Sequence, residues 1–135
     1  HQMIAQALGG RCSHTDRGWG IGIKEIRIQK KMVWMKPVLE HCRLIVSHQD
    51  QVVKLPEGAT VIGGNSHCPN SLISVGDHFL GIQAHPEFTP AYAKALMQMR
   101  VKRIGQEVIR QAQETLSHET DESSITGWMV NFLEK

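Results

Sequence analysis

The sequence predicts an α/β fold, in which a series of short strands is followed by helices. Residues 19–28 alternate apolar and polar side chains, which indicates a half-buried strand. Short apolar runs then follow one another as far as residue 83, separated by Gly, Asn, Pro and Asp. After Pro90 the apolar residues recur every three or four positions, as they do along one face of a helix. Elements in this order favour a layered α/β domain with a polar turn at the carboxyl ends of its strands.

The strand-forming part of the chain divides at turn-forming residues. Beyond residues 19–28 and a shorter apolar run at 32–35, strands are expected at 43–47, 52–55, 60–63, 72–75 and 79–83. The first two of these later strands are joined by the polar turn His48-Gln49-Asp50. Gly76-Asp77 is typical of a tight hairpin turn, so the last two strands are expected to pair with each other.

Helices are expected at both ends of the chain, over residues 1–8, 90–116 and 125–133. The first stops at Gly9-Gly10. Thr89 is a candidate N-cap for the second, with Pro90 at its first position. Gly105 inside that helix costs about 1 kcal/mol relative to alanine, so it marks a bend or a close contact. Asp121 is a candidate cap for the third helix.

Length and composition limit the function classes. A chain of 135 residues allows one domain with a sizeable core, and its 41% hydrophobic and 21% charged residues are ordinary for a globular protein. The net charge of +2 is too small to argue for nucleic acid or an anionic membrane as a partner. No uninterrupted apolar run is long enough to span a bilayer. We therefore expect neither a nucleic-acid partner nor a membrane.

The cysteines and histidines do not form a recognisable framework. Three cysteines without regular spacing favour reduced thiols and a cytoplasmic protein over a disulfide scaffold. Eight histidines invite a metal site, but neither Cys-x-x-Cys nor His-Glu-x-x-His is present. No metal and no other cofactor is therefore expected.

The motif with the clearest chemistry is Gln83-Ala84-His85-Pro86-Glu87. On an extended segment, side chains two residues apart point to the same side, so His85 and Glu87 are expected to lie together. Such a pair suits an imidazole that acts as a general base, oriented by a carboxylate. Pro86 between them restricts the backbone. The simpler alternative is a histidine at a strand end that pairs with a solvent-facing glutamate.

Three segments together resemble the class I glutamine amidotransferases, which use a Cys, His, Glu triad. In that family a nucleophile elbow, Gly-x-Cys-x-Gly-His-Gln, continues directly into a helix, as His1-Gln2 does here. The family's x-Gln-x-His-Pro-Glu signature matches residues 82–87. A third match covers residues 47–52 and 55–59, and is most similar to the glutaminase part of GMP synthase. The resemblance covers essentially the whole chain.

The resemblance implies both a fold and a reaction. The fold would be the C-terminal portion of a flavodoxin-like open sheet flanked by helices, with a parallel sheet whose first strands have no counterpart in residues 1–135. In the reaction, a cysteine thiolate attacks the side-chain amide of L-glutamine, giving a glutamyl thioester and ammonia. His85 would be the base that later protonates the ammonia, and Glu87 would orient it. The residues implied to bind glutamine are Gln2, His48, Gln49 and Asp50.

The nucleophile departs from the family pattern. If His1-Gln2 ends the elbow, the cysteine belongs three residues before His1, so the domain at 1–135 is expected to be incomplete at its N-terminus. Cys12, Cys42 and Cys68 lack the elbow glycines and are expected to be ordinary thiols. The chain alone is therefore predicted to be inactive. An acceptor or synthase subunit, or a second copy of the chain, would be its protein partner.

Other functions remain open on the sequence. The chain could be a non-catalytic amidotransferase-like module for interaction or regulation, although such a module has no chemical need for His85 and Glu87. It could also be a related hydrolase that cleaves γ-glutamyl bonds with the same triad. For the substrate-binding candidates, Gln2 could be a helix-surface amide, and residues 48–50 could be a simple connecting turn.

Overall fold

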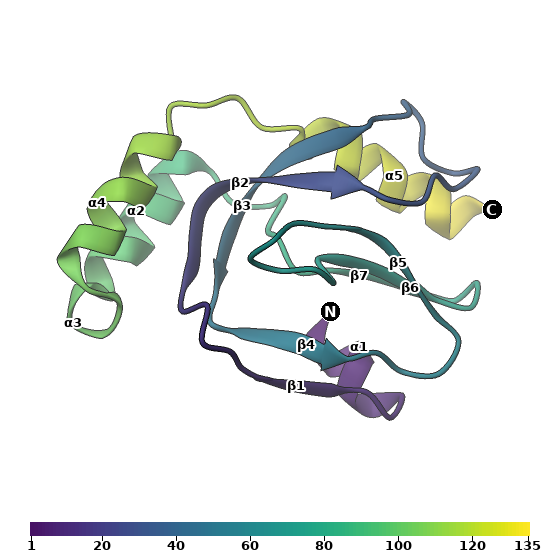
Figure 1. Cartoon of the computed structure of the whole chain (residues 1–135). Helices are drawn as coiled ribbons and strands as arrows, with labels where there is room; N and C mark the ends of the chain where they lie inside the picture. Colours follow the sequence, from purple (N-terminus) through teal and green to yellow (C-terminus); the bar gives the residue numbers. More distant parts are fainter.

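The computed structural model describes all of residues 1–135, which form two antiparallel sheets and five helices (Figure 1). The strands are β1 (Arg11–His14), β2 (Gly20–Ile28), β3 (His41–His48), β4 (Asp50–Lys54), β5 (Ala59–Gly64), β6 (Leu72–Val75) and β7 (Phe79–Ile82). The helices are α1 (Gln2–Ala7), α2 (Pro90–Met99), α3 (Val101–Ile104), α4 (Gln106–Thr115) and α5 (Glu122–Glu134). The α/β class predicted from the sequence is confirmed.

The larger sheet has the strand order β3-β2-β5-β6-β7, and β1 pairs with β4 in the smaller one. Every strand pair is antiparallel, so the expectation of a parallel sheet in this part of the fold is wrong. For β6 and β7, the short connection explains the difference. A parallel neighbour needs a crossover of a dozen or more residues, whereas only Gly76–His78 separate β6 from β7.

The two sheets meet where β3 ends and β2 begins, at the pair formed by His48 and Gly20. β3 ends at His48 and β4 begins at Asp50, so Gln49 alone carries the chain from the larger sheet to the smaller one. In Figure 1, β4 starts at the lower end of β3 and runs to the right beside β1, with α1 next to both strands. The predicted turn at residues 48–50 therefore stands at this junction, close to the first helix.

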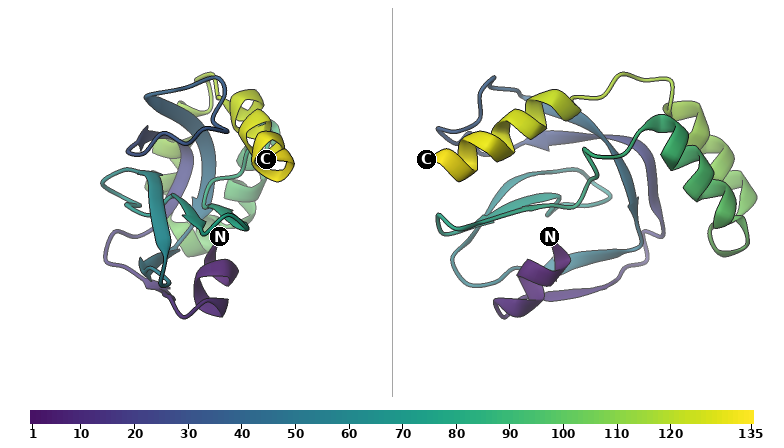
Figure 2. Two further views of the ribbon diagram at one scale, coloured as in Figure 1. Left: turned by 90° about the vertical axis from the view of Figure 1, so that its right-hand side faces the viewer. Right: turned by 180° about the vertical axis from the view of Figure 1, so that it is seen from behind.

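Two apolar clusters stabilise the larger sheet. Alternate side chains of β3 point to opposite faces, so Leu44 and Val46 join the cluster beneath α5, while Ile45 joins the one beneath α2 and α4. Figure 2 shows these two groups of helices in separate places against the sheet. Each buried aliphatic side chain of this kind contributes roughly 1.5–3 kcal/mol to folding.

The apolar run at residues 32–35 forms a turn and no strand. Trp34 and Met35 are buried in the cluster beneath α5, where Trp34 meets Phe132 edge to face at 5.3 Å between ring centroids. The indole nitrogen of Trp128 donates to the carbonyl of Pro37 at 2.8 Å. This segment therefore anchors the last helix.

The single helix expected over residues 90–116 is broken twice, at Arg100, which the sequence did not predict, and at Gly105, its predicted weak point. Gly105 separates α3 from α4 with φ 97° and ψ 140°, a conformation that L side chains rarely adopt. The predicted cap is confirmed, because the Thr89 hydroxyl accepts from the Tyr92 amide at 3.2 Å. Asp121 precedes α5 as predicted, but its carboxylate accepts from the Arg43 amide at 2.7 Å and does not cap the helix. No helix combines the length and apolar character needed to cross a membrane.

Candidate functional site

His85 and Glu87 lie in hydrogen-bond contact just after β7. The distance between His85 Nδ1 and Glu87 Oε1 is 2.8 Å. The two residues stand in a turn and not on an extended segment, because the Phe88 amide donates to the His85 carbonyl at 3.2 Å. Pro86 takes the position after His85, where proline favours a turn of this kind. The turn brings the two side chains together, as the sequence motif suggested, although by a different backbone geometry.

Two further contacts hold His85, one through its backbone and one through its ring. Its backbone amide donates to the carbonyl of Ile45 on β3 at 2.8 Å. The ring of Phe88 stacks on the imidazole with centroids 4.1 Å apart and an angle of 7° between the planes. The His85 side chain is 31% exposed, so it is fixed from one side and open on the other.

A polar cavity of about 430 Å³ lies on the open side of His85. Among the residues that line it are Gln2, His48, Gln49, Asp50 and His85. Five of the six site residues predicted from the sequence therefore share one cavity, although they come from α1, the β3–β4 junction and the turn after β7. Glu87, the sixth, contacts His85 and lines the neighbouring cavity.

Gln2 and Asp50 are joined to each other. The side-chain nitrogen of Gln2 donates to the backbone carbonyl of Asp50 at 2.8 Å. The Asp50 carboxylate also contacts Nδ1 of His14, the residue opposite it across the β1–β4 pair. His14 lines the same cavity and was not found from the sequence, because residues 11–14 carry no strand pattern.

His48 is a buried and neutral member of this cavity. The residue is 7% exposed, and burial lowers its pKa to about 4, with a smaller contribution from nearby His67. The two imidazoles meet edge to face at 5.8 Å between centroids. A Cβ at Gly20 would lie 2.7 Å from Nε2 of His48, so only glycine leaves room for the ring.

None of the three cysteines lines the cavity beside His85. Cys42 and Cys68 are buried, and burial raises the pKa of Cys42 to about 12 and raises that of Cys68 as well. Burial also raises the pKa of Cys12, whose thiol donates to the Gln2 carbonyl at 3.4 Å. The thiolate is the nucleophilic form of cysteine, so these environments favour unreactive thiols.

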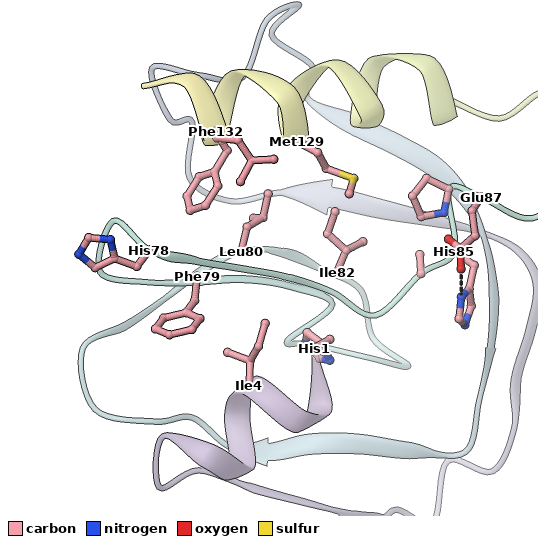
Figure 3. Close-up of a pocket in the computed structure, with 13 residues that line it drawn as sticks. His1, Ile4, His78, Phe79, Leu80, Ile82, His85, Glu87, Met129 and Phe132 are labelled. Atoms are coloured by element: carbon pink, nitrogen blue, oxygen red, sulfur yellow. Dashed lines mark hydrogen bonds and ion pairs between the residues drawn. The ribbon is translucent and has the colours of Figure 1, made fainter.

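An apolar cavity of about 500 Å³ lies on the other side of the His85–Glu87 turn (Figure 3). Figure 3 shows side chains from α1, β7 and α5 that point into the space between these elements. They include Ile4, Phe79, Leu80, Ile82, Met129 and Phe132. The His85–Glu87 pair closes one end of this cavity, so it stands between a polar space and an apolar one.

Arg100 and Arg103, which sequence reasoning also missed, line the polar cavity from its helical side. Nη1 of Arg100 donates to the hydroxyl of Ser47 at 3.1 Å. The guanidinium of Arg103 stands over the ring of Trp19 at 5.1 Å from its centroid. The spacing of apolar residues in this segment predicts which side of the helix is buried. It does not predict which residues the polar side chains contact, so the two arginines could not be placed from the sequence.

Fold and site together describe an α/β protein with an imidazole–carboxylate pair at the edge of a polar cavity, an arrangement suited to general-base chemistry. The sequence model of the family "Glutamine amidotransferase class-I" matches residues 1–102. The chain belongs to this family. The match includes all six residues that the sequence motifs singled out.

Curated relatives include peptidases and synthases. "Gamma-glutamyl peptidase 3" of Arabidopsis thaliana is 34% identical over 94 residues, which are 65% of this chain and 38% of that protein. "Gamma-glutamyl peptidase 2" of the same plant is 29% identical over 98% of this chain and 56% of its own length. "GMP synthase [glutamine-hydrolyzing]" of Bacillus velezensis is 37% identical over 64% of this chain and 17% of that protein. The chain thus spans about half or less of these relatives.

Solved structures show the same fold. A glutamine amidotransferase of Thermotoga maritima superposes with a TM-score of 0.74 at 21% identity, over 98% of this chain and 57% of that one. A glutamine amidotransferase of Methylobacillus flagellatus gives 0.76 at 17% identity, over 98% and 59% of the two chains. At these identities the likeness concerns the fold alone.

Proposed function

We propose that this chain supplies the base and the orienting acid for hydrolysis of a γ-glutamyl amide. A cysteine thiolate that precedes residue 1 attacks the amide carbon, the carbon–nitrogen bond breaks, and a glutamyl thioester remains. His85 takes the thiol proton and gives it to the leaving nitrogen, and a water molecule then hydrolyses the thioester. Glu87 fixes the imidazole tautomer and stabilises its charged form.

The observation that carries this proposal is the 2.8 Å contact between His85 Nδ1 and Glu87 Oε1. Because Nδ1 is engaged by the carboxylate, Nε2 is left for proton transfer, and it makes no hydrogen bond within the chain. The imidazole is also fixed by stacking on Phe88, so it does not need to reorient during turnover.

The polar cavity supports a binding role for the other predicted residues. Gln2 and Asp50 would hold the amino-acid head of the substrate, and His48 and Gln49 would complete that wall. Neutral His48 offers the substrate a hydrogen-bonding group without a charge, since its pKa is lowered to about 4 by burial. In this arrangement L-glutamine gives glutamate and ammonia, and an acceptor or synthase subunit would consume the ammonia.

A related peptidase activity is the second candidate. In that case the leaving group is the amine of an amino acid or peptide, and the same triad chemistry applies. The relatives named γ-glutamyl peptidases, at 34% identity for one of them, favour this candidate. A non-catalytic module is the least favoured alternative, because the histidine, its carboxylate and its stacking partner are assembled beside the cavity.

The test is a comparison of two histidine variants in the complete protein that carries this chain. His85→Ala should lower kcat with glutamine or a γ-glutamyl dipeptide by roughly 10⁴-fold or more, since a triad base is not replaced by packing. His78→Ala, at an exposed position outside the polar cavity, is the control and should retain activity. Near-normal turnover by His85→Ala would contradict the proposal.

A further inference from the structure

Two arginines stand in the polar cavity without a carboxylate to neutralise them. Neither Arg100 nor Arg103 forms an ion pair within the chain, although both line the same cavity as His85. The carboxylate of Asp50, which also lines this cavity, is in contact with His14. The wall formed by the two arginines is therefore positive and faces a space large enough for a small ligand.

Both guanidinium groups are positioned without using most of their donors. An arginine has five N–H donors, and Arg100 uses one of them on the Ser47 hydroxyl at 3.1 Å. Arg103 is held over the face of Trp19, at 5.1 Å from the ring centroid, and this contact needs none of its donors. Groups that are already ordered, charged and still able to donate are suited to bidentate binding of a carboxylate.

The position of the two arginines determines which part of a bound substrate they contact. Gln2 and Asp50, proposed to bind the amino-acid head, reach the cavity from α1 and β4. Arg100 and Arg103 reach it from the end of α2 and from α3, and Figure 1 shows these helices well away from α1 and β4. A substrate with its head at Gln2 and its amide at His85 therefore extends its leaving group towards the arginines.

We propose that Arg100 and Arg103 bind a carboxylate on the leaving-group side of the scissile amide. This inference rests on the proposed function and narrows its substrate class. The substrate is a γ-glutamyl amino acid or peptide with a free C-terminal carboxylate. Glutamine is a poorer substrate, because its leaving group is ammonia and reaches neither arginine.

The experiment compares γ-glutamylglycine with γ-glutamylglycinamide, which differ only in that carboxylate, using the complete protein. The wild type should prefer the free acid by roughly ten- to hundredfold in kcat/KM, the range of a charge-assisted hydrogen bond. Arg100→Gln and Arg103→Gln should lose this preference through KM, with kcat little changed. Lys102→Gln removes the same charge from an exposed neighbour outside the cavity and should keep the preference.

Binding to the His85→Ala variant, measured by calorimetry, separates recognition from catalysis. γ-Glutamylglycine should bind this variant more tightly than its amide does, and Arg100→Gln in the same background should remove the difference. A third ligand, with the α-carboxylate of the glutamyl group amidated, identifies the carboxylate involved.

The inference is overturned if the arginine variants no longer distinguish ligands with a free α-carboxylate from ligands with an amidated one. It is also overturned if the wild type does not distinguish γ-glutamylglycine from its amide. Full activity of His85→Ala would instead overturn the proposed function.

Discussion

His85 is held by the carboxylate of Glu87, by stacking on Phe88 and by a backbone hydrogen bond to β3. The first two partners lie within three residues of His85 in the sequence. This is why the pair with Glu87 could be predicted from the residue types and their spacing. His14, His67 and the two arginines could not be predicted in the same way. They reach the site through pairing and packing between segments that are far apart in the chain, and no local pattern records such contacts.

Glu87→Gln should be less damaging than His85→Ala. The amide keeps the shape of the side chain but removes the charge that orients and stabilises the imidazolium, whereas Phe88 still holds the ring. We expect a loss in kcat roughly ten- to hundredfold smaller than that of His85→Ala. Steady-state kinetics of both variants in the complete protein would check this order. Equal losses would mean that Glu87 does more than orient the base.

His48 should make folding stability depend on pH. In the unfolded chain its pKa is the ordinary 6.5, whereas in the folded chain burial lowers it to about 4, and nearby His67 and His85 add to this effect while Asp50 opposes it. Between these values the unfolded state binds more protons, so stability falls as the pH is lowered. The contribution lost between pH 7.5 and pH 5 is about 2 kcal/mol.

Denaturant unfolding at these two pH values would measure this effect. On acidification from pH 7.5 to pH 5, the free energy of unfolding of His48→Gln should fall by about 2 kcal/mol less than that of the wild type, because glutamine does not titrate. His78→Gln, at an exposed position, should behave as the wild type does. The interpretation of His48 as a buried neutral group would be contradicted if His48→Gln kept the full pH dependence.

At the level of elements, periodicity predicted most strands and helices but not how the strands pair. The alternation in residues 20–28 and the hairpin at Gly76 are local signals, and the structure contains β2, β6 and β7 where these signals lie. β1 lacks such a signal because its four residues are mainly half-buried or exposed, and it is held by its antiparallel partner β4. The run at 32–35 is apolar because it packs beneath α5, which periodicity alone does not distinguish from a strand.

Two glycines should respond in opposite directions to alanine. Gly105, between α3 and α4, has a positive φ, so Gly105→Ala should destabilise the fold by about 1–3 kcal/mol through backbone strain. Gly127 lies within α5, where an added Cβ would approach only the Lys36 carbonyl at 3.8 Å. Gly127→Ala should therefore stabilise by roughly 0.5–1 kcal/mol. Thermal or denaturant unfolding of both variants would test these signs, and destabilisation by Gly127→Ala would show that α5 packs more tightly there.

At the scale of the whole molecule, one face of residues 1–135 is apolar and open. Leu133 on α5 and Phe79 on β7 are 80% and 42% exposed. The apolar cavity of about 500 Å³ lies between α1, β7 and α5, and β7 is an edge strand of the larger sheet. An exposed edge strand beside apolar side chains favours association with another chain or segment. The family resemblance of the sequence indicated that one face of the core would be uncovered. The structure shows where that face lies, between the first and the last helix.

The isolated chain should therefore self-associate at micromolar concentration. Leu133→Glu places a charge in the apolar cavity and should shift sedimentation towards the monomer. Met99→Glu makes the same change at an 84% exposed position outside that cavity and should leave association unchanged. A compact wild-type monomer at all concentrations would contradict the assignment of this face as an interface.

Ammonia release from L-glutamine by the isolated 135-residue chain distinguishes a domain without its nucleophile from one that carries its own. The chain holds His85 and Glu87 in hydrogen-bond contact, but none of its three cysteines lines the cavity beside them. We predict no release above the buffer control, because loss of the nucleophile from a triad costs several orders of magnitude in rate. Ammonia release that His85→Ala abolishes would contradict the account, since one of Cys12, Cys42 and Cys68 would then be the nucleophile.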